Sequence, residues 1–272
     1  MSLLALAAAL PCAAADDSLT TISIDAITQE WRQTLLRLRP ELAGLVAAIK
    51  IRVVTAGEMK KFSRRPNVEG HYDWTTGEVA VNRALLTSLH AKAAAKTSDA
   101  DRAVALLTFD VIDHEISGHA DAVRRLEKVS GRYSGKVIDE EVTAFAIEAE
   151  GLTRAYADPA FRQGIAAVPD LARQRHQEIL GLIPLGVAGF KRVVHARGYG
   201  LPNVAAKVKE YNDYADRIKK MKMTMMGQTD EQAEADAAVK RARENAQNLE
   251  RFYVDERVRL ETLLSAAGPS PY

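Results

Sequence analysis

Cysteine is almost absent from this chain, and so is any excess of charge of one sign. The single cysteine, Cys12, lies in an N-terminal segment expected to be removed, so the fold must rest on its hydrophobic core or on a metal rather than on disulfides. The 37 basic and 36 acidic residues give a formal net charge of +1, which offers no electrostatic case for nucleic-acid binding. With 272 residues, 47% of them hydrophobic, the chain can form one or two domains with a sizeable core.

Long uncharged apolar runs are also missing, which argues against an integral membrane segment in the mature chain. The most apolar internal stretch, residues 179–190, contains Pro184 and three glycines, and this pattern predicts a broken core helix. No internal repeat is present. The chain therefore reads as a globular domain with its own core.

The first fifteen residues resemble a secretory signal peptide in composition. A short apolar run from Leu3 to Leu10 is followed by Pro11 and small residues, which predicts cleavage after Ala15. No Lys or Arg precedes the run, so a truncated start and a simple N-terminal helix remain as alternatives. Export would place the mature protein in the periplasm or outside the cell.

The stretch from Asp110 to Ala120 carries two histidines and a glutamate where the pattern otherwise indicates a buried helix. His114 and His119 are five residues apart, and at about 100° per residue a regular helix would leave their rings roughly 140° apart. A π-bulge between them would bring both rings to one ion, and such bulges concentrate at functional sites. Gly118, which costs about 1 kcal/mol relative to Ala in a helix, fits a distorted turn. The spacing therefore predicts a metal site on a bulged helix.

The chemistry of these residue types suggests their roles. Neutral imidazoles of His114 and His119 would bind zinc, and Glu115 would take a proton from metal-bound water as it attacks a carbonyl. A third ligand is needed, and we expect it from a second helix that begins near Val137 and passes the first. The chance alternative is that these residues coincide on a charged helix.

Only one of two adjacent glutamates on that second helix can face the motif helix, because neighbours point about 100° apart. We expect Glu141 to be the ligand, since it shares its face with Ala144, Phe145 and Glu148. Glu148 could then accept a hydrogen bond from a ligand imidazole. Glu140 would point elsewhere, toward substrate or the N-terminal dipole of its own helix.

The sequence His114-Glu-Ile-Ser-Gly-His119 resembles the HExxGH motif of the dipeptidyl peptidase III family. Glu140, Glu141 and Ala144 are similar to its second motif. The resemblance covers residues 114–145, and the element from Glu141 to Ala144 also resembles other gluzincins. It implies zinc held by two His and the second Glu of the pair, a π-bulged motif helix, and hydrolysis of peptide bonds.

Two further segments are candidates for contacts with a peptide substrate. Residues 71–82 form two alternating runs around a Thr-Thr-Gly turn, which predicts a hairpin. Its second run could act as an edge strand that pairs with an extended substrate, or it could merely cover the core. This second run consists of Val79, Ala80, Val81 and Asn82. After a later helix, His195, Arg197 and Tyr199 could stabilise an oxyanion, or they could be exposed loop groups.

These patterns predict a predominantly α-helical α+β fold. Residues 16–150 would form a zincin-like catalytic part with a small sheet, and residues 151–272 a helical C-terminal part of the same domain. The expected helices include 24–38, 99–128, 204–223 and 229–266, with a first strand near 49–55. The expected function is that of an exported zinc metallopeptidase. The alternatives are an exported helical binding or scaffold protein with a structural metal site, and a metal hydrolase acting on a non-peptide amide.

Overall fold

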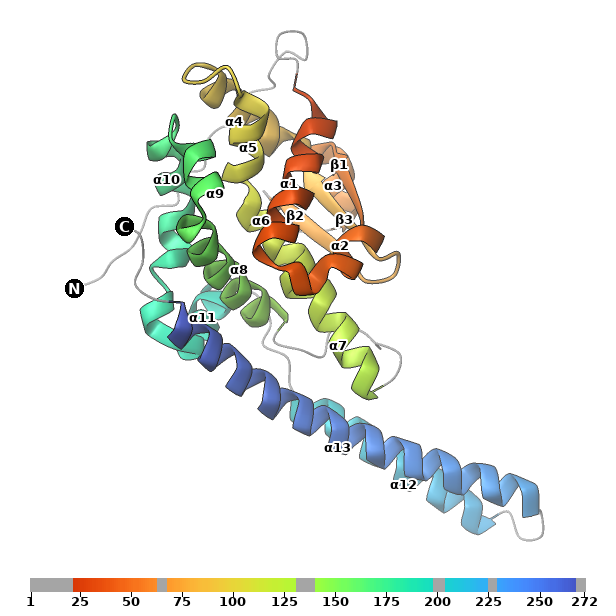
Figure 1. Ribbon diagram of the computed structural model, residues 1–272. Helices are drawn as coiled ribbons and strands as arrows, with labels where there is room; N and C mark the ends of the chain where they lie inside the picture. The colour runs from red at the N-terminus through yellow and green to blue at the C-terminus, as the bar shows by residue number, and fades with distance from the viewer. Residues whose placement is uncertain (1–21, 63–67, 131–139, 198–203, 225–228, 268–272) are drawn as a thin grey trace.

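A computed structural model describes residues 22–62, 68–130, 140–197, 204–224 and 229–267 of the chain. It is a predominantly α-helical α+β protein, as predicted, with helices packed around a three-stranded sheet and a long helical hairpin that extends away from the body (Figure 1). Residues 1–15, the predicted signal peptide, lie outside the described residues, as does Tyr199.

The N-terminal helices cover both faces of the sheet. Their bounds are α1 Ile24–Leu38, η1 Pro40–Leu42, α2 Ala43–Ala48, α3 Ala56–Phe62 and α4 Arg83–Ala94. The expected helix 24–38 is confirmed as α1, and the Ser23 hydroxyl accepts a hydrogen bond from the Ala26 amide at its start. Its buried face includes Trp31, whose indole N–H donates to the Ala105 carbonyl at 3.0 Å. This contact joins α1 to the helices that precede the motif.

The sheet corrects one prediction about substrate binding. Its strands are β1 Lys50–Val54, β2 Gly70–Asp73 and β3 Glu78–Asn82, in the order β1-β3-β2. β3 runs parallel to β1 and antiparallel to β2, so Val79 pairs with Ile51 on one side and Tyr72 on the other. The expectation that residues 79–82 form an edge strand is therefore wrong, because both sides of β3 are already hydrogen-bonded. The hairpin itself is confirmed.

The motif lies on a nearly continuous run of helix. The run consists of α5 Ala100–Leu107, α6 Phe109–Asp113, the π-helix η2 His114–Ala120 and α7 Asp121–Ser130. The predicted helix 99–128 is interrupted at Thr108, whose hydroxyl donates to the Val104 carbonyl at 2.8 Å. The second motif lies on α8 Glu140–Ala157, and the helix start expected near Val137 falls outside the described residues.

The remaining chain is helical, as expected. Its elements are α9 Pro159–Ile165, α10 Pro169–Leu180, η3 Ile183–Leu185, α11 Gly186–Ala196, α12 Val204–Thr224 and α13 Thr229–Ala266. By length and composition the segment Pro169–Ala196 is the one described stretch apolar enough to cross a membrane. It is broken at η3, where Pro184 stands and Gly186 follows with φ of 59°, as predicted for residues 179–190. The buried residues of α10, η3 and α11, such as Leu180 and Phe190, belong to the main core.

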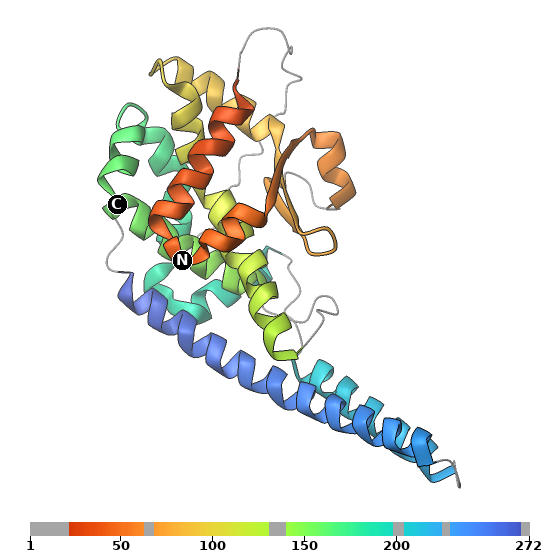
Figure 2. The ribbon, with the colours of Figure 1, turned by 45° about the vertical axis from the view of Figure 1, so that its right-hand side comes forward.

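α12 and α13 pair side by side and form an arm that projects beyond α7 (Figure 2). A small apolar cluster fastens the arm to the body. It joins Val123 and Leu126 of α7 to Val208, Ala246, Leu249 and Phe252 of the arm. The C-terminal turns of α13 reach the main core through Leu260 and Leu264. The arm thus meets the body beside α7, where Tyr72 of β2 also packs against this cluster.

Candidate metal centre

The π-helix brings the two motif histidines together. Hydrogen bonds from residue i to i+5 place side chains five residues apart on nearly the same face, which a regular helix cannot do. The rings of His114 and His119 lie 4.9 Å apart between centroids, at an interplanar angle of 74°. The expected distortion is present, and it extends over all seven residues of η2.

Gly118 has a second role that the sequence pattern did not reveal. A Cβ atom at this position would lie 2.6 Å from the Cα of Ala144 and 2.7 Å from its Cβ. α8 therefore crosses the motif helix at a contact that only two small residues permit. Ala144, which the helix phase placed on the same face as Glu141, is one of these two residues, and Gly118 is the other.

This close crossing places Glu141 beside both imidazoles. Its Oε2 lies 3.6 Å from His114 Nε2 and 3.9 Å from His119 Nε2. One ligand atom from each residue lies within 4.8 Å of the other two, so the three could hold a metal ion. Bond lengths near 2.1 Å in a tetrahedral site require ligand atoms about 3.4 Å apart, which is close to these separations. The side chain of Glu140 lies outside the described residues, so its comparison with Glu141 remains a prediction.

Glu148 contacts the first histidine from behind. Its Oε2 lies 2.9 Å from His114 Nδ1, the position expected from the helix phase. Burial opposes a charged imidazole, but hydrogen bonds to Glu141 and Glu148 outweigh it and raise the pKa of His114. Burial lowers the pKa of His119 to about 4, so its imidazole is neutral near neutral pH. With its Nδ1–H donated to Glu148, His114 would bind a metal through Nε2 after that nitrogen loses its proton.

Glu115 is buried next to the group formed by His114, His119 and Glu141, and strand β2 of the sheet contacts it. Burial raises the pKa of its carboxyl to about 7, an effect that His114 opposes and Glu141 reinforces. The backbone N–H of Tyr72 in β2 donates a hydrogen bond to the carboxylate. A Cβ at Gly70 would lie 2.9 Å from Glu115 Oε1 and 2.6 Å from Val111 Cγ1. Glycine at position 70 is therefore what lets β2 approach the motif helix.

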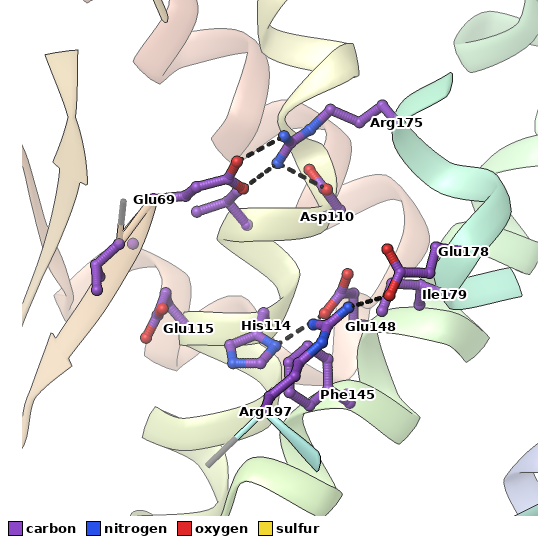
Figure 3. A pocket seen from close by; sticks show the side chains of 13 residues that line it. Glu69, Asp110, His114, Glu115, Phe145, Glu148, Arg175, Glu178, Ile179 and Arg197 are labelled. Carbon is purple, nitrogen blue, oxygen red and sulfur yellow. Dashed lines mark hydrogen bonds and ion pairs between the residues drawn. The ribbon is translucent and has the colours of Figure 1, made fainter. Parts of the chain in front are cut away.

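A cavity of about 550 Å³ opens beside these groups (Figure 3). His114, Glu115 and Glu148 line it, as do Asp110 and Arg175, which the motif analysis did not identify. The signal that could have revealed Asp110 is its spacing: it lies four residues before His114, on the same helix face. No local pattern marks Arg175, which comes from α10.

The structure gives different positions to His195 and Arg197, two of the residues considered as candidates for stabilising an oxyanion. Arg197 lines the cavity, with its guanidinium 5.0 Å from the centre of the Phe145 ring, and it pairs with Glu178. His195 is exposed and is not among the described residues that line the cavity, which disfavours it as an oxyanion donor.

The opposite face of the motif helix is fixed by a buried ionic cluster. Arg39 contacts both oxygens of Asp113, at 2.6 and 2.8 Å, and also pairs with Glu150 at 3.0 Å. Ser117 donates a hydrogen bond to Asp113 as well. The cluster ties α6, η2 and α8 to the end of α1, so the ligand-bearing elements are held together from behind.

Comparisons with known proteins found no match: no family model, no curated protein and no solved structure matches the chain. The resemblance to the dipeptidyl peptidase III family therefore rests on the motif residues of this chain alone.

Proposed function

We propose that the protein is a zinc-dependent peptidase. The observation that carries the proposal is the convergence of two imidazoles and one carboxylate next to a cavity that His114 and Glu115 line. Two His and one Glu are a donor set that catalytic zinc sites use, with a fourth position open to water or substrate. A buried carboxylate next to the first ligand has no use in a purely structural site.

The residues have distinct tasks in this mechanism. His114, His119 and Glu141 would hold the ion, and Glu148 orients His114 through its Nδ1. When bound, zinc supplies Lewis acidity, which lowers the pKa of a coordinated water and polarises a carbonyl. Glu115 accepts the proton of the attacking water and returns it to the leaving amine. Its raised pKa of about 7 suits a group that must do both near neutral pH.

β2, rather than β3, has an edge available for an extended substrate. The Asn82 amide donates to the Glu69 carbonyl, so in the alternating antiparallel ladder Gly70 and Tyr72 point their backbone groups away from β3. The Tyr72 amide already donates to Glu115, which brings this strand next to the proposed general base, and Gly70 of the same edge lines the cavity. A peptide that pairs with this edge would lie along the cavity, so strand addition remains part of the proposal with a different strand.

The decisive test combines metal analysis with one substitution. We expect about one zinc per purified chain, and we expect Glu115→Gln to keep the metal while hydrolysis of casein falls by a factor on the order of 10² to 10⁴. Glu127→Gln is the matched control, because Glu127 is exposed on α7. A Glu115→Gln protein that cleaves at the unsubstituted rate would refute the assignment. Bound zinc without hydrolysis of any peptide would favour the scaffold alternative or a non-peptide amide substrate.

The choice of third ligand has its own test. Zinc retention during dialysis should be lost in Glu141→Ala and kept in Glu140→Ala, with folding of both checked by circular dichroism. The opposite result would mean that α8 presents its other face to the motif helix.

Export of the mature chain remains a proposal that N-terminal sequencing of the secreted protein would test.

A further inference from the structure

Two arginines line the cavity, and they differ in whether a ligand can reach them. The side chain of Arg175 is 14% exposed, and its guanidinium is bonded to the carboxylates of Glu69 and Asp110 and to a backbone carbonyl (Figure 3). The side chain of Arg197 is 35% exposed and, within the described part of the chain, pairs with Glu178. Arg197 is therefore the cavity arginine whose charge is open to a substrate.

The partner of Arg197 can be displaced at low cost. The side chain of Glu178 is 69% exposed, so it can turn into solvent without leaving a buried charge behind. Ion pairs between side chains as exposed as these contribute little to stability, because water solvates both groups well. A carboxylate that replaces Glu178 beside Arg197 would also leave the number of charges at this end of the cavity unchanged.

The other four carboxylates of the lining are held by partners other than Arg197. An entering carboxylate would therefore compete with Glu178 for this guanidinium. The four contacts are those of Glu69 and Asp110 with Arg175, of Glu148 with His114, and of Glu115 with the Tyr72 backbone amide.

Two ring contacts relate Arg197 to the first expected metal ligand. Its guanidinium lies 5.0 Å from the centre of the Phe145 ring, and that ring lies 4.7 Å from the His114 ring. The guanidinium is therefore no more than about 10 Å from the imidazole, a span that an extended peptide covers with about three residues. A substrate whose scissile bond lies at the ligand group would present a side chain or terminus two or three residues away to Arg197.

We propose that Arg197 anchors the substrate by binding one of its carboxylates two or three residues from the scissile bond, and that Glu178 occupies this place when no substrate is bound. The inference rests on the peptidase function proposed above and specifies its substrate class. The carboxylate belongs either to the C-terminus of the peptide or to an acidic side chain near the cleaved bond. In the first case the enzyme removes short C-terminal fragments, and in the second it cleaves within acidic segments.

The test measures binding rather than turnover. Zinc-loaded Glu115→Gln protein, which leaves the probes intact, is titrated by calorimetry with three acetylated peptides of six residues. One is hexaalanine amide, the second is hexaalanine with a free C-terminus, and the third is hexaalanine amide with glutamate as its fourth residue. We expect at least one carboxylate peptide to bind about tenfold or more tightly than the neutral amide. The peptide that does so identifies the source of the carboxylate.

A substitution of Arg197 then locates the preference. Arg197→Gln, added to the Glu115→Gln protein, should reduce the ratio of the carboxylate and neutral affinities to about one. Arg192→Gln removes the same charge from an exposed position on α11 and should leave the ratio unchanged. A carboxylate that binds to the metal instead of the guanidinium would keep its preference in Arg197→Gln, and this result would overturn the proposal.

A substitution of Glu178 tests whether this residue holds the place of the substrate. Glu178→Gln removes the internal competitor, so the preferred carboxylate peptide should bind about two- to fivefold more tightly, while the affinity of the neutral amide stays the same. If Arg197 merely joined α10 to α11, this substitution would produce no such gain. If Arg197→Gln fails to fold, as judged by circular dichroism, the result with Glu178→Gln decides in its place.

The proposal is also overturned if the three peptides bind equally, if none binds, or if Glu178→Gln leaves the affinity of the carboxylate peptide unchanged. Hydrolysis of casein by the unsubstituted protein is a separate measurement. Cleavage of casein without a carboxylate preference would remove the subsite alone, whereas absence of cleavage would remove the peptidase function.

Discussion

The motif helix has two charged faces, and they differ in how completely their charges are paired. On the face toward α1, Asp113 accepts hydrogen bonds from Arg39 and Ser117 within a buried cluster. On the face toward the cavity, one buried oxygen of Asp110 has no hydrogen-bond partner among the described residues, and Glu115 is held by a backbone amide. The closed face fixes the helix, whereas the open face leaves its groups for a ligand. Substitutions on the closed face should therefore change the stability of the protein, whereas substitutions on the open face should mainly change its affinity for zinc.

The largest effect should come from breaking the closed face. Arg39→Met leaves Asp113 buried without a cation and Glu150 with Arg154 alone, which should destabilise the protein by about 3–5 kcal/mol in urea unfolding. Arg37→Met is the matched control, because that ion pair with Asp158 is partly exposed and should contribute at most about 1 kcal/mol. Equal effects of the two substitutions would show that the closed face does not anchor the helix.

The crossing of η2 and α8 is the next most sensitive point. A Cβ at Gly118 would overlap Ala144, so Gly118→Ala should cost about 1–3 kcal/mol of stability and weaken zinc binding. At Gly44, on α2, a Cβ would meet nothing within 4 Å. Gly44→Ala should therefore be neutral or stabilising by up to about 1 kcal/mol. Thermal unfolding of both proteins checks the contrast, and a tolerated Gly118→Ala would contradict the close crossing.

The open face should respond in metal affinity more than in stability. Glu148→Gln weakens the hydrogen bond that orients His114, and we expect zinc affinity to fall about 10- to 100-fold in a chelator competition. Glu178→Gln changes a carboxylate of the same cavity that pairs with Arg197 and should leave the affinity unchanged. If the two substitutions act alike, the effect belongs to the charge of the cavity and not to the orientation of His114.

The sequence predicted those features that depend on local spacing. The five-residue interval between His114 and His119 indicated a π-distortion, and the phase of α8 placed Glu141 opposite them. Both inferences use only the turn angle of a helix. The hairpin was also local, but the alternation in Val79–Asn82 defines a strand without defining its neighbours, and this is why its edge position was wrong.

Contacts between distant segments could not be predicted in this way. Arg175 and Asp110 are 65 residues apart, and Arg39 and Asp113 are 74 apart, so no periodicity connects them. Each arginine meets its carboxylates only because α1 and α10 pack on the motif helices. The sequence pattern therefore did not identify Arg39 and Arg175 as partners of the site, although the residues beside each of them follow a clear helical pattern.

The last predicted effect concerns the pH dependence of stability at His176, which lies behind the open face. It is fully buried, it bonds through Nε2 to the Leu107 carbonyl at 3.1 Å, and the Tyr156 hydroxyl donates to its Nδ1 at 2.9 Å. Burial, reinforced by Arg175, lowers its pKa from 6.5 to about 3. The imidazole is thus neutral in the folded protein throughout the range in which the unfolded chain takes up a proton.

The sign of the pH effect follows from these two values. Below pH 6.5 the unfolded state binds a proton that the folded state does not, so this contribution to stability is complete above 6.5 and is lost as the pH falls toward 3. His176→Gln removes the titrating group, so urea unfolding of the unsubstituted protein should lose up to about 1.4 kcal/mol per pH unit more than the variant between pH 6 and pH 4. If the difference in unfolding free energy between the unsubstituted protein and the His176→Gln variant stays constant over this range, His176 is protonated in the folded protein. In that case water reaches the region behind the open face.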